Sequence, residues 1–237
     1  MVQLLPREFA IDLTVKAIPY RRTENVARRL AARHEAIIAA ARQIASEGGM
    51  AAVQIATVAE RANIATGTVY RYFPAKTDLV AALLREIAAR EIGALRRAAS
   101  SAPGPLSALC AAIMIFAARG RRDRRLSFAA IAEPVDAELD AARTALRKSL
   151  AAEFAQLIAA AIAEARLPEQ DAGLAAAALT GLLIEGSIGP LAPDEAGRDR
   201  ELVQSLALAG LRALGVADAR ARGLVVQTAI PAEEAAF

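Results

Sequence analysis

The sequence predicts an all-α protein, from its composition and from the spacing of its apolar residues. Hydrophobic residues make up 55% of the 237 residues while aromatic residues make up only 4%, and alanine dominates. Alanine favours helices, whereas sheets draw on β-branched and aromatic residues. In several stretches apolar residues recur three and four positions apart, which places them on one helix face. We therefore expect many helices packed closely through small side chains.

The single cysteine and the single histidine restrict the chemistry that we expect of the chain. Cys110 alone cannot form an intrachain disulfide, and His34 alone gives no His/Cys metal site. We therefore expect no metal, no cofactor and the reducing cytoplasm. A glycine-rich phosphate loop and a nucleophile beside an activating histidine are also absent from the sequence, so we do not expect an enzyme.

The chain begins with an extension and a long helix. Residues 1–22 have no sustained period and lack the apolar core of a secretory signal, so we expect them to be disordered. A helix is expected over 23–46, and Gly48 and Gly49 would end it. Its apolar stripe comprises Leu30, Ile37, Ala41 and Ile44.

A short amphipathic helix is predicted from residue 55, where apolar residues recur at helical intervals. Asn63 follows it, and asparagine accepts the left-handed backbone conformation that ends a helix. Ile64 is apolar and should fix the turn against the core. The inner face of the helix comprises Ile55, Val58, Ala59 and Ala62.

A second helix is predicted to begin near Thr66, whose hydroxyl would cap the first turn, with Val69 and Phe73 facing inward. Pro74 ends this helix, and a third begins with Lys76 in its first turn, where an anion binds favourably. The outer face of the second helix can reach base edges and phosphates in a DNA major groove. It comprises Thr66, Gly67, Thr68, Tyr70, Arg71 and Tyr72.

The stretch from Ile37 to Leu79 resembles the TetR family of one-component bacterial transcription regulators, above all in the run TGTVYRYFPAKTDL. The resemblance implies an N-terminal three-helix helix-turn-helix DNA-binding domain and a C-terminal helical domain for ligand binding and dimerisation. It also implies which positions face bases, namely Thr66, Gly67, Thr68 and Tyr70. The positions that bind phosphates are Arg71, Tyr72 and Lys76.

Three positions depart from the family pattern. Gln54 stands where Ser or Thr is usual and is a poorer helix cap. Asn63 stands where glycine is usual, and it tolerates the same turn. Ala65 stands where serine is common, so capping is expected to pass to Thr66.

The charge of the chain is unevenly distributed. Residues 1–97 hold 15 Lys+Arg and 9 Asp+Glu, giving +6, while residues 98–237 hold 14 and 17, giving −3. The basic part contains the helix-turn-helix, as expected for a DNA-binding end, although a chance division of surface charge is the alternative.

An alternative for residues 1–22 is an arm that binds the DNA minor groove. Its arginines would be Arg21, Arg22, Arg28 and Arg29.

A break between domains is expected at SSAPGP, residues 100–105, after a connecting helix over 75–97. We expect a disordered extension at 1–22, a DNA-binding domain with its connecting helix at 23–97, and a ligand-binding and dimerisation domain at 98–237. The connecting helix would act as a lever between the two domains. Later helices are expected over 106–118, 126–132, 136–166, 169–187 and 198–214, and residues 216–237 are expected to fray.

The helix over 106–118 carries bulky, adaptable apolar side chains, which with later aromatics either line a ligand cavity or form core. These residues are Cys110, Ile113, Met114, Phe116, Phe128, Phe154 and Leu157. The arginine-rich run at 119–125 is interpreted as a solvated loop, with a phosphate contact or an acidic ligand as alternatives.

Residues 172–184 form an uncharged run of 13 residues, which is shorter than the roughly 18 needed for a membrane span. Small residues there let another helix approach closely. The resemblance implies a homodimer in which the last two long helices pair in a four-helix bundle. We assign to this interface Leu174, Ala178, Gly181, Leu182, Ile188, Leu202, Leu206 and Leu211.

We therefore expect a homodimeric transcription regulator that binds a partly palindromic operator in double-stranded DNA and is released by a small apolar effector. The resemblance favours repression. One alternative is an α-helical enzyme or small-molecule-binding protein in which the motif is fortuitous. Another is a nucleoid protein that binds any duplex.

Overall fold

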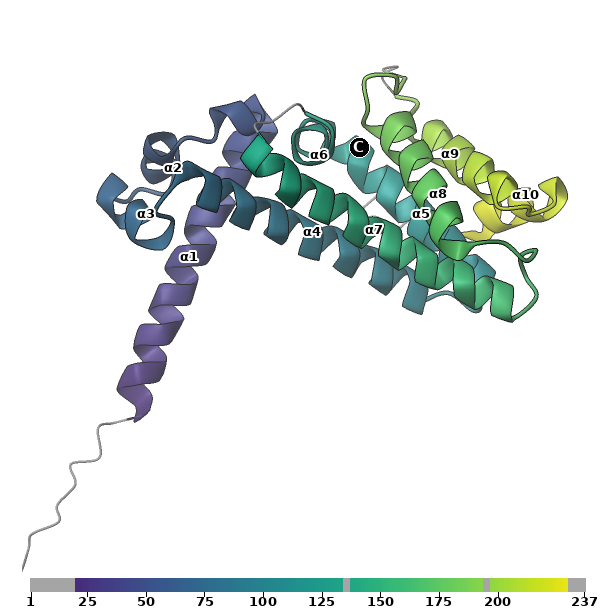
Figure 1. Cartoon of the computed structure of the whole chain (residues 1–237), viewed down its shortest axis with the longest axis horizontal. Coiled ribbons are helices and arrows are strands. Elements are labelled where there is room, and N and C mark those ends of the chain that lie inside the picture. The colour runs from purple at the N-terminus through teal and green to yellow at the C-terminus, as the bar shows by residue number, and fades with distance from the viewer. Residues whose placement is uncertain (1–19, 134–136, 194–196, 230–237) are drawn as a thin grey trace, which may run out of the picture. The chain divides into compact units, whose positions relative to one another are not determined.

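The computed structural model describes residues 20–133, 137–193 and 197–229, and across these ranges the chain is helical, as the sequence predicts (Figure 1). The chain divides after Glu35 into two compact units. No helix in the described ranges combines the length and the apolar character that crossing a bilayer requires.

The first helix, α1 (Tyr20–Gly48), begins earlier than expected. Its first three residues, 20–22, fall in the predicted extension, and residues 1–19 lie outside the described residues. Ile37, Ala41 and Ile44 are buried as predicted, but Leu30 is 52% exposed. Burial of the stripe begins only where α1 enters the second unit, which starts at Ala36.

Four short or connecting elements follow α1. The turn η1 (Met50–Ala52) leads into α2 (Ile55–Arg61) and α3 (Thr66–Tyr72), and α4 (Lys76–Ser100) runs from there to the break predicted at 100–105. α4 is one uninterrupted helix of 25 residues. It packs against α5 and α7, and Figure 1 shows α4 and α7 side by side.

The remaining helices surround α5, which contacts all of them and α4. Most residues of α5 are buried, so it forms the centre of this part of the core. These helices, called the C-terminal helices below, are α5 (Pro105–Arg122), α6 (Arg124–Ile131), α7 (Ala137–Ala163), α8 (Ala172–Ser187), α9 (Asp199–Ala213) and α10 (Asp218–Gln227).

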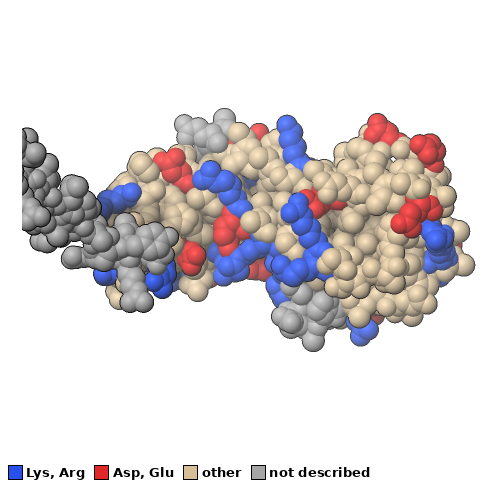
Figure 2. Space-filling model, turned by 90° about the horizontal axis from the view of Figure 1, so that it is seen from below, with Lys and Arg blue, Asp and Glu red and all other residues tan. Residues whose placement is uncertain are grey.

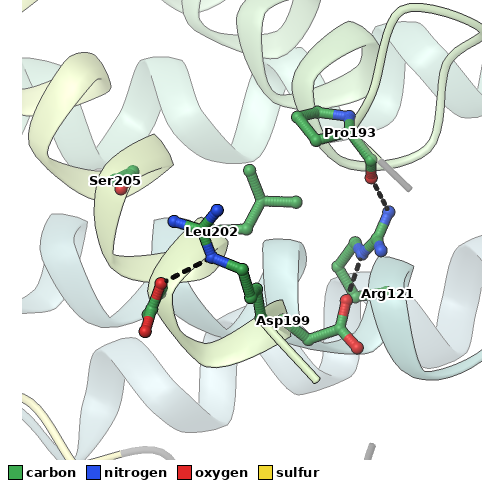
Figure 3. Close-up of a pocket in the computed structure, with 7 residues that line it drawn as sticks. Arg121, Pro193, Asp199, Leu202 and Ser205 are labelled. Carbon is green, nitrogen blue, oxygen red and sulfur yellow. Dashed lines mark hydrogen bonds and ion pairs between the residues drawn. The ribbon is translucent and has the colours of Figure 1, made fainter. Parts of the chain in front are cut away.

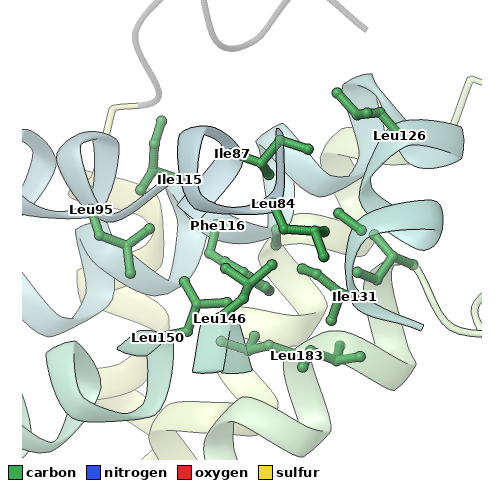
Figure 4. Packing of buried hydrophobic residues seen from close by; sticks show 14 of the residues in the cluster. Leu84, Ile87, Leu95, Ile115, Phe116, Leu126, Ile131, Leu146, Leu150 and Leu183 are labelled. Atoms are coloured by element: carbon green, nitrogen blue, oxygen red, sulfur yellow. The ribbon is translucent and has the colours of Figure 1, made fainter. Parts of the chain in front are cut away.

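The core is continuous from α1 to α10 and is built almost wholly from aliphatic side chains. Leucines and isoleucines from five helices meet in it (Figure 4). Phe116 and Phe154 form an aromatic pair in it, with ring centroids 6.2 Å apart and planes 80° apart. Such an edge-to-face contact contributes beyond simple apolar burial.

The arginine-rich run at 119–125 is not a solvated loop, so that interpretation is wrong. α5 continues to Arg122, and the Asp123 carboxylate accepts a hydrogen bond from the Leu126 N–H at 3.4 Å, which caps α6. Arg119 donates to both carboxylate oxygens of Glu91 on α4, at 2.6 and 2.9 Å. Arg121 donates to Asp199 on α9. These carboxylates are 28 and 78 positions away along the chain, which is why local sequence gave no sign of them.

The predicted fraying after residue 216 is wrong for α10. Ala221 and Val225, one helical turn apart, are buried, and α10 packs against α9 and α5. The Asp218 carboxylate also pairs with Arg212 of α9 and with Arg222 of its own helix. Residues 230–237 lie outside the described residues.

Candidate nucleic-acid interface

The first helix of the motif and its turn have the predicted geometry. Ile55, Val58 and Ala59 are buried, and Asn63 has a left-handed backbone, with φ of 52°. The N–H of Ile64 then bonds to the Ala59 carbonyl oxygen at 2.9 Å, and its side chain packs against the core. The turn therefore fixes where α3 begins.

The second helix, α3, is held by two buried residues. Val69 is fully buried and Phe73 nearly so, as predicted. The predicted capping by Thr66 is wrong, because Ala65 precedes the helix and Thr66 is already its first helical residue. No side chain caps the start of α3. Anchored through these apolar residues, α3 turns its other face to solvent.

The outward face of α3 carries most of the residues assigned to DNA. Thr66, Gly67, Tyr70 and Arg71 are exposed, and Tyr70 is 51% exposed. Nothing lies within 4 Å of the position that a Cβ on Gly67 would occupy, so the space above it is open. The remaining assigned residues are half-buried, and they are Thr68 and Tyr72 on α3 and Lys76, the first residue of α4.

The first turn of α4 holds a carboxylate that the sequence interpretation passed over. Asp78 Oδ2 accepts a hydrogen bond from the Ala75 N–H at 3.0 Å. A polar residue three positions after a helix start is the pattern that could have identified it. Asp78 therefore already occupies part of the helix terminus that Lys76 begins, and the phosphate contact of Lys76 stays a prediction.

A salt bridge links α2 of the motif to α1. Arg61 at the end of α2 donates to both oxygens of Glu47 on α1, at 2.7 and 2.8 Å. These hydrogen bonds lower the pKa of the Glu47 carboxyl and raise the pKa of Arg61. Arg61 is thereby already bonded to a carboxylate of the same chain.

Figure 2 shows Lys and Arg side chains over the end that carries α2 and α3 and over the middle of one face.

The residues assigned to a dimer interface separate into two groups. Leu174 is 71% exposed on α8, Ala178 is exposed on the same face, and Gly181, Leu182 and Leu202 are half-buried. The others are already buried within the protomer, and their assignment to a partner interface stays a prediction. A Cβ on Gly186 would lie only 2.3 Å from Leu206, which shows how closely α9 packs on α8 within one chain. These buried residues are Ile188, Leu206 and Leu211.

The residues assigned to a ligand cavity lie in or beside the core. Five are buried, and Phe128 and Leu157 are half-buried. Burial raises the pKa of the Cys110 thiol, which accepts a hydrogen bond from Thr228 at 3.4 Å. That the seven assigned residues line a ligand cavity stays a prediction. The five buried residues are Cys110, Ile113, Met114, Phe116 and Phe154.

Two hollows in the described residues have other linings. One, of about 280 Å³, lies between the end of α4, the start of α5 and the end of α10. Its polar groups are neutral. The sequence did not predict them, because SSAPGP was interpreted only as a break between domains. They belong to Ser101, Ser107, Gln227 and Thr228.

The second hollow, of about 180 Å³, lies beside the start of α9 and is charged (Figure 3). Arg121 lies along its wall and donates to Asp199 at 2.5 Å and to the Pro193 carbonyl oxygen at 3.0 Å. Arg198 and Glu201 pair on the other side at 2.9 Å. Since these charged side chains already pair with one another, we interpret this hollow as a place where helices are held together.

Comparison with known proteins identifies the motif. Residues 37–83 match the model of bacterial regulatory proteins of the tetR family. Over 55 residues the chain is 54% identical to the HTH-type transcriptional repressor KstR of Rhodococcus jostii (strain RHA1) and 56% identical to KstR of Mycolicibacterium smegmatis. These matches cover 23% of this chain and 26% and 27% of the relatives, so they span about a quarter of the relatives' length.

Solved structures match over more of the chain. The crystal structure of RolR in complex with resorcinol has 25% sequence identity and a TM-score of 0.63, and the match covers 85% of this chain and 96% of RolR. FadR from Bacillus subtilis, in complex with stearoyl-CoA, has 21% identity and a TM-score of 0.60, with 73% of this chain and 96% of FadR covered. The second of these likenesses concerns the fold alone.

Proposed function

Because this chain belongs, through residues 37–83, to the tetR family of bacterial regulatory proteins, we propose that it is a DNA-binding transcription repressor. One observation carries the proposal: α3 is anchored by Val69 and Phe73 and turns Thr66, Gly67 and Tyr70 to solvent. The KstR proteins that are similar over this segment are repressors, which favours that sign of regulation.

In this proposal, α3 enters the major groove. Thr66, Gly67, Thr68 and Tyr70 face base edges, and Gly67 lets the helix approach closely. Phosphate contacts hold the helix in register without reading sequence. The residues that supply them are Arg71, Tyr72 and Lys76.

We infer that the repressor is a homodimer paired through α8 and α9. The exposed face of α8 is apolar and has small residues, so a second helix can approach it closely; Leu174, Ala178 and Gly181 lie on it, with Leu182 and Leu202 beside them. Two heads would then occupy successive major grooves with centres about 34–36 Å apart. An arginine in place of Ala178 should give monomers in light scattering, and a variant that stays dimeric would reject this interface.

We further propose that a small, largely apolar effector binds among the C-terminal helices and lowers DNA affinity. The neutral hollow of about 280 Å³ supports an uncharged molecule with few polar groups. Thr228 lines it and bonds to Cys110, the first of the residues predicted for a cavity. The bound resorcinol of RolR makes that phenol a reasonable first probe. By linkage, the effector and DNA must weaken each other by the same factor.

Selection of genomic fragments by the purified protein, at physiological salt and against random duplex, tests the proposal. Recovery of one inverted repeat is the expected result. Salt-sensitive binding without sequence preference would favour a nucleoid protein instead. If no fragment binds, the proposed DNA binding is rejected, and the alternative of a helical protein that binds small molecules is favoured.

A further inference from the structure

A carboxylate from the C-terminal helices reaches the turn that leads into the helix-turn-helix. Glu133 follows α6, and its Oε2 accepts a hydrogen bond from the backbone N–H of Met50 at 2.9 Å. Met50 is buried and is the first residue of η1. The two residues are 83 positions apart but lie within one compact unit.

The turn is shaped to receive this carboxylate. Gly49 has a φ of 77°, and a Cβ there would lie 3.0 and 3.1 Å from the two Glu133 oxygens. Gly49 itself offers no side chain to cap η1. The first N–H groups of a helical turn need an acceptor, and a negative charge suits that end. Glu133 therefore supplies from another element the cap that the local sequence lacks.

Glu133 is itself held in place by α6 and α7. Its N–H bonds to the Phe128 carbonyl oxygen of α6 at 2.8 Å. Arg143 of α7, 6% exposed, donates to the carbonyl oxygens of Ala129 and Ala130 at 3.0 and 3.3 Å. The last turn of α6 is thus bonded to α7, and this contact fixes the backbone from which the Glu133 carboxylate extends.

The other end of α6 is tied to the segment after α8. Arg124 donates to the carbonyl oxygens of Gly189 and Ala192, at 3.5 and 3.3 Å. α6 is therefore attached at its start to the α8–α9 segment and at its end, through Glu133, to η1. Only two residues, Val53 and Gln54, separate η1 from α2.

We propose that Glu133 is a positioning residue for DNA binding: its carboxylate holds η1, and through η1 the helix-turn-helix, at the angle that α6 dictates. The inference rests on the proposed function. A shift of α6 either breaks the cap or moves η1 with it, so the same contact transmits changes among the C-terminal helices to α3.

The contact is tested first without DNA, by amide hydrogen exchange at Met50 in the full chain. Glu133→Ala and the shorter Glu133→Asp should speed exchange about five- to ten-fold, the effect of losing one hydrogen bond. Glu133→Gln should stay near the parent, because its amide oxygen still accepts. Glu164→Ala, at an exposed glutamate, is the matched control. Unchanged exchange in Glu133→Ala overturns the proposal.

The positioning role is tested on the recovered operator duplex and on random duplex. Glu133→Ala should lower operator affinity about five-fold, leave random-duplex affinity and its salt dependence unchanged, and be rescued in Glu133→Gln. A purely structural role would lower the melting temperature without altering the ratio of the two affinities, and that result would overturn the proposal. If the parent protein recovers no operator, the proposed function fails and the positioning role falls with it, even where exchange at Met50 responds.

Discussion

Arg71 on α3 and Arg121 on α5 carry the same guanidinium group in opposite surroundings. Arg71 is exposed on the outer face of a helix whose inner face is fixed by Val69 and Phe73. The side chain of Arg121 is 6% exposed and is bonded to Asp199. The first guanidinium is presented to whatever approaches α3, whereas the second joins α5 to α9.

This contrast extends to the regions around the two arginines. In the helix-turn-helix, apolar residues fix the backbone and polar residues face outward. Among the C-terminal helices, apolar residues fill the interior, and charged side chains with little exposure bond to other helices, as Arg121 of α5 does to Asp199 of α9. Substitutions on the outer face of α3 should therefore change binding and leave stability intact, while substitutions of buried apolar or ion-paired residues among the C-terminal helices should mainly change stability.

The strongest test of this division is Phe154→Ala. Phe154 is fully buried and packs edge-to-face against Phe116, so the substitution should lower the free energy of unfolding by about 3–5 kcal/mol. Urea denaturation monitored by circular dichroism measures the loss. The conservative Phe154→Leu should lose clearly less. A loss below about 1 kcal/mol in Phe154→Ala would mean that this part of the core relaxes freely.

Next in size is Asp199→Ala, which leaves the buried Arg121 without its carboxylate. Removing one partner of a buried pair typically lowers stability by about 3–5 kcal/mol, and we expect the lower end, because Asp199 is 21% exposed. Glu201→Ala is the control, since it breaks the exposed pair with Arg198 and should change stability by less than about 0.5 kcal/mol. Equal effects in thermal denaturation would contradict the division.

On α3 the expected change is in binding. Tyr70→Ala and Thr68→Ala should each reduce the preference for operator over random duplex by about 1–3 kcal/mol, with stability little changed. Lys76→Ala should weaken binding to all sequences alike and flatten the salt dependence. Fluorescence anisotropy at several salt concentrations separates the two behaviours. If all three variants lost specificity equally, the assignment of base and phosphate contacts would be wrong.

The smallest expected effect concerns pH and α10. Hydrogen bonds from Arg222 and Arg212 lower the pKa of Asp218, so the carboxylate stabilises the folded state at neutral pH. That contribution is present above the unfolded pKa and is lost as pH falls through the folded pKa. Asp218→Asn should therefore be less stable than the parent at pH 7, and the two should converge in strong acid. A difference in melting temperature that persists in acid would assign the effect to something other than charge.

The sequence predicted the helix-turn-helix well because its determinants are local. Asn63 ends α2, and Val69 and Phe73 are one turn apart, so neighbouring residues suffice to place them. Contacts between distant parts of the chain have the opposite property, and the sequence did not indicate them. Arg121 is paired with a carboxylate 78 positions away, and Met50 is capped from 83 positions away. No local period encodes such partners.

The dimer face shows an intermediate case. Helical spacing correctly indicated an apolar α8, but it could not tell which of its two apolar sides faces α9 of the same chain. Leu206 packs on Gly186 inside the protomer, while Leu174 remains exposed. Small residues mark close helix contacts and do not reveal whether the neighbouring helix belongs to the same chain.

Gly67 places folding and function in opposition. A glycine within a helix lowers stability by about 0.5–1 kcal/mol relative to alanine, and the open space above Gly67 would admit a methyl group. A library selected only for heat resistance should therefore replace it, while one selected for operator occupancy should retain it. Variants selected only for thermostability would then have a well-folded α3 that no longer binds the operator.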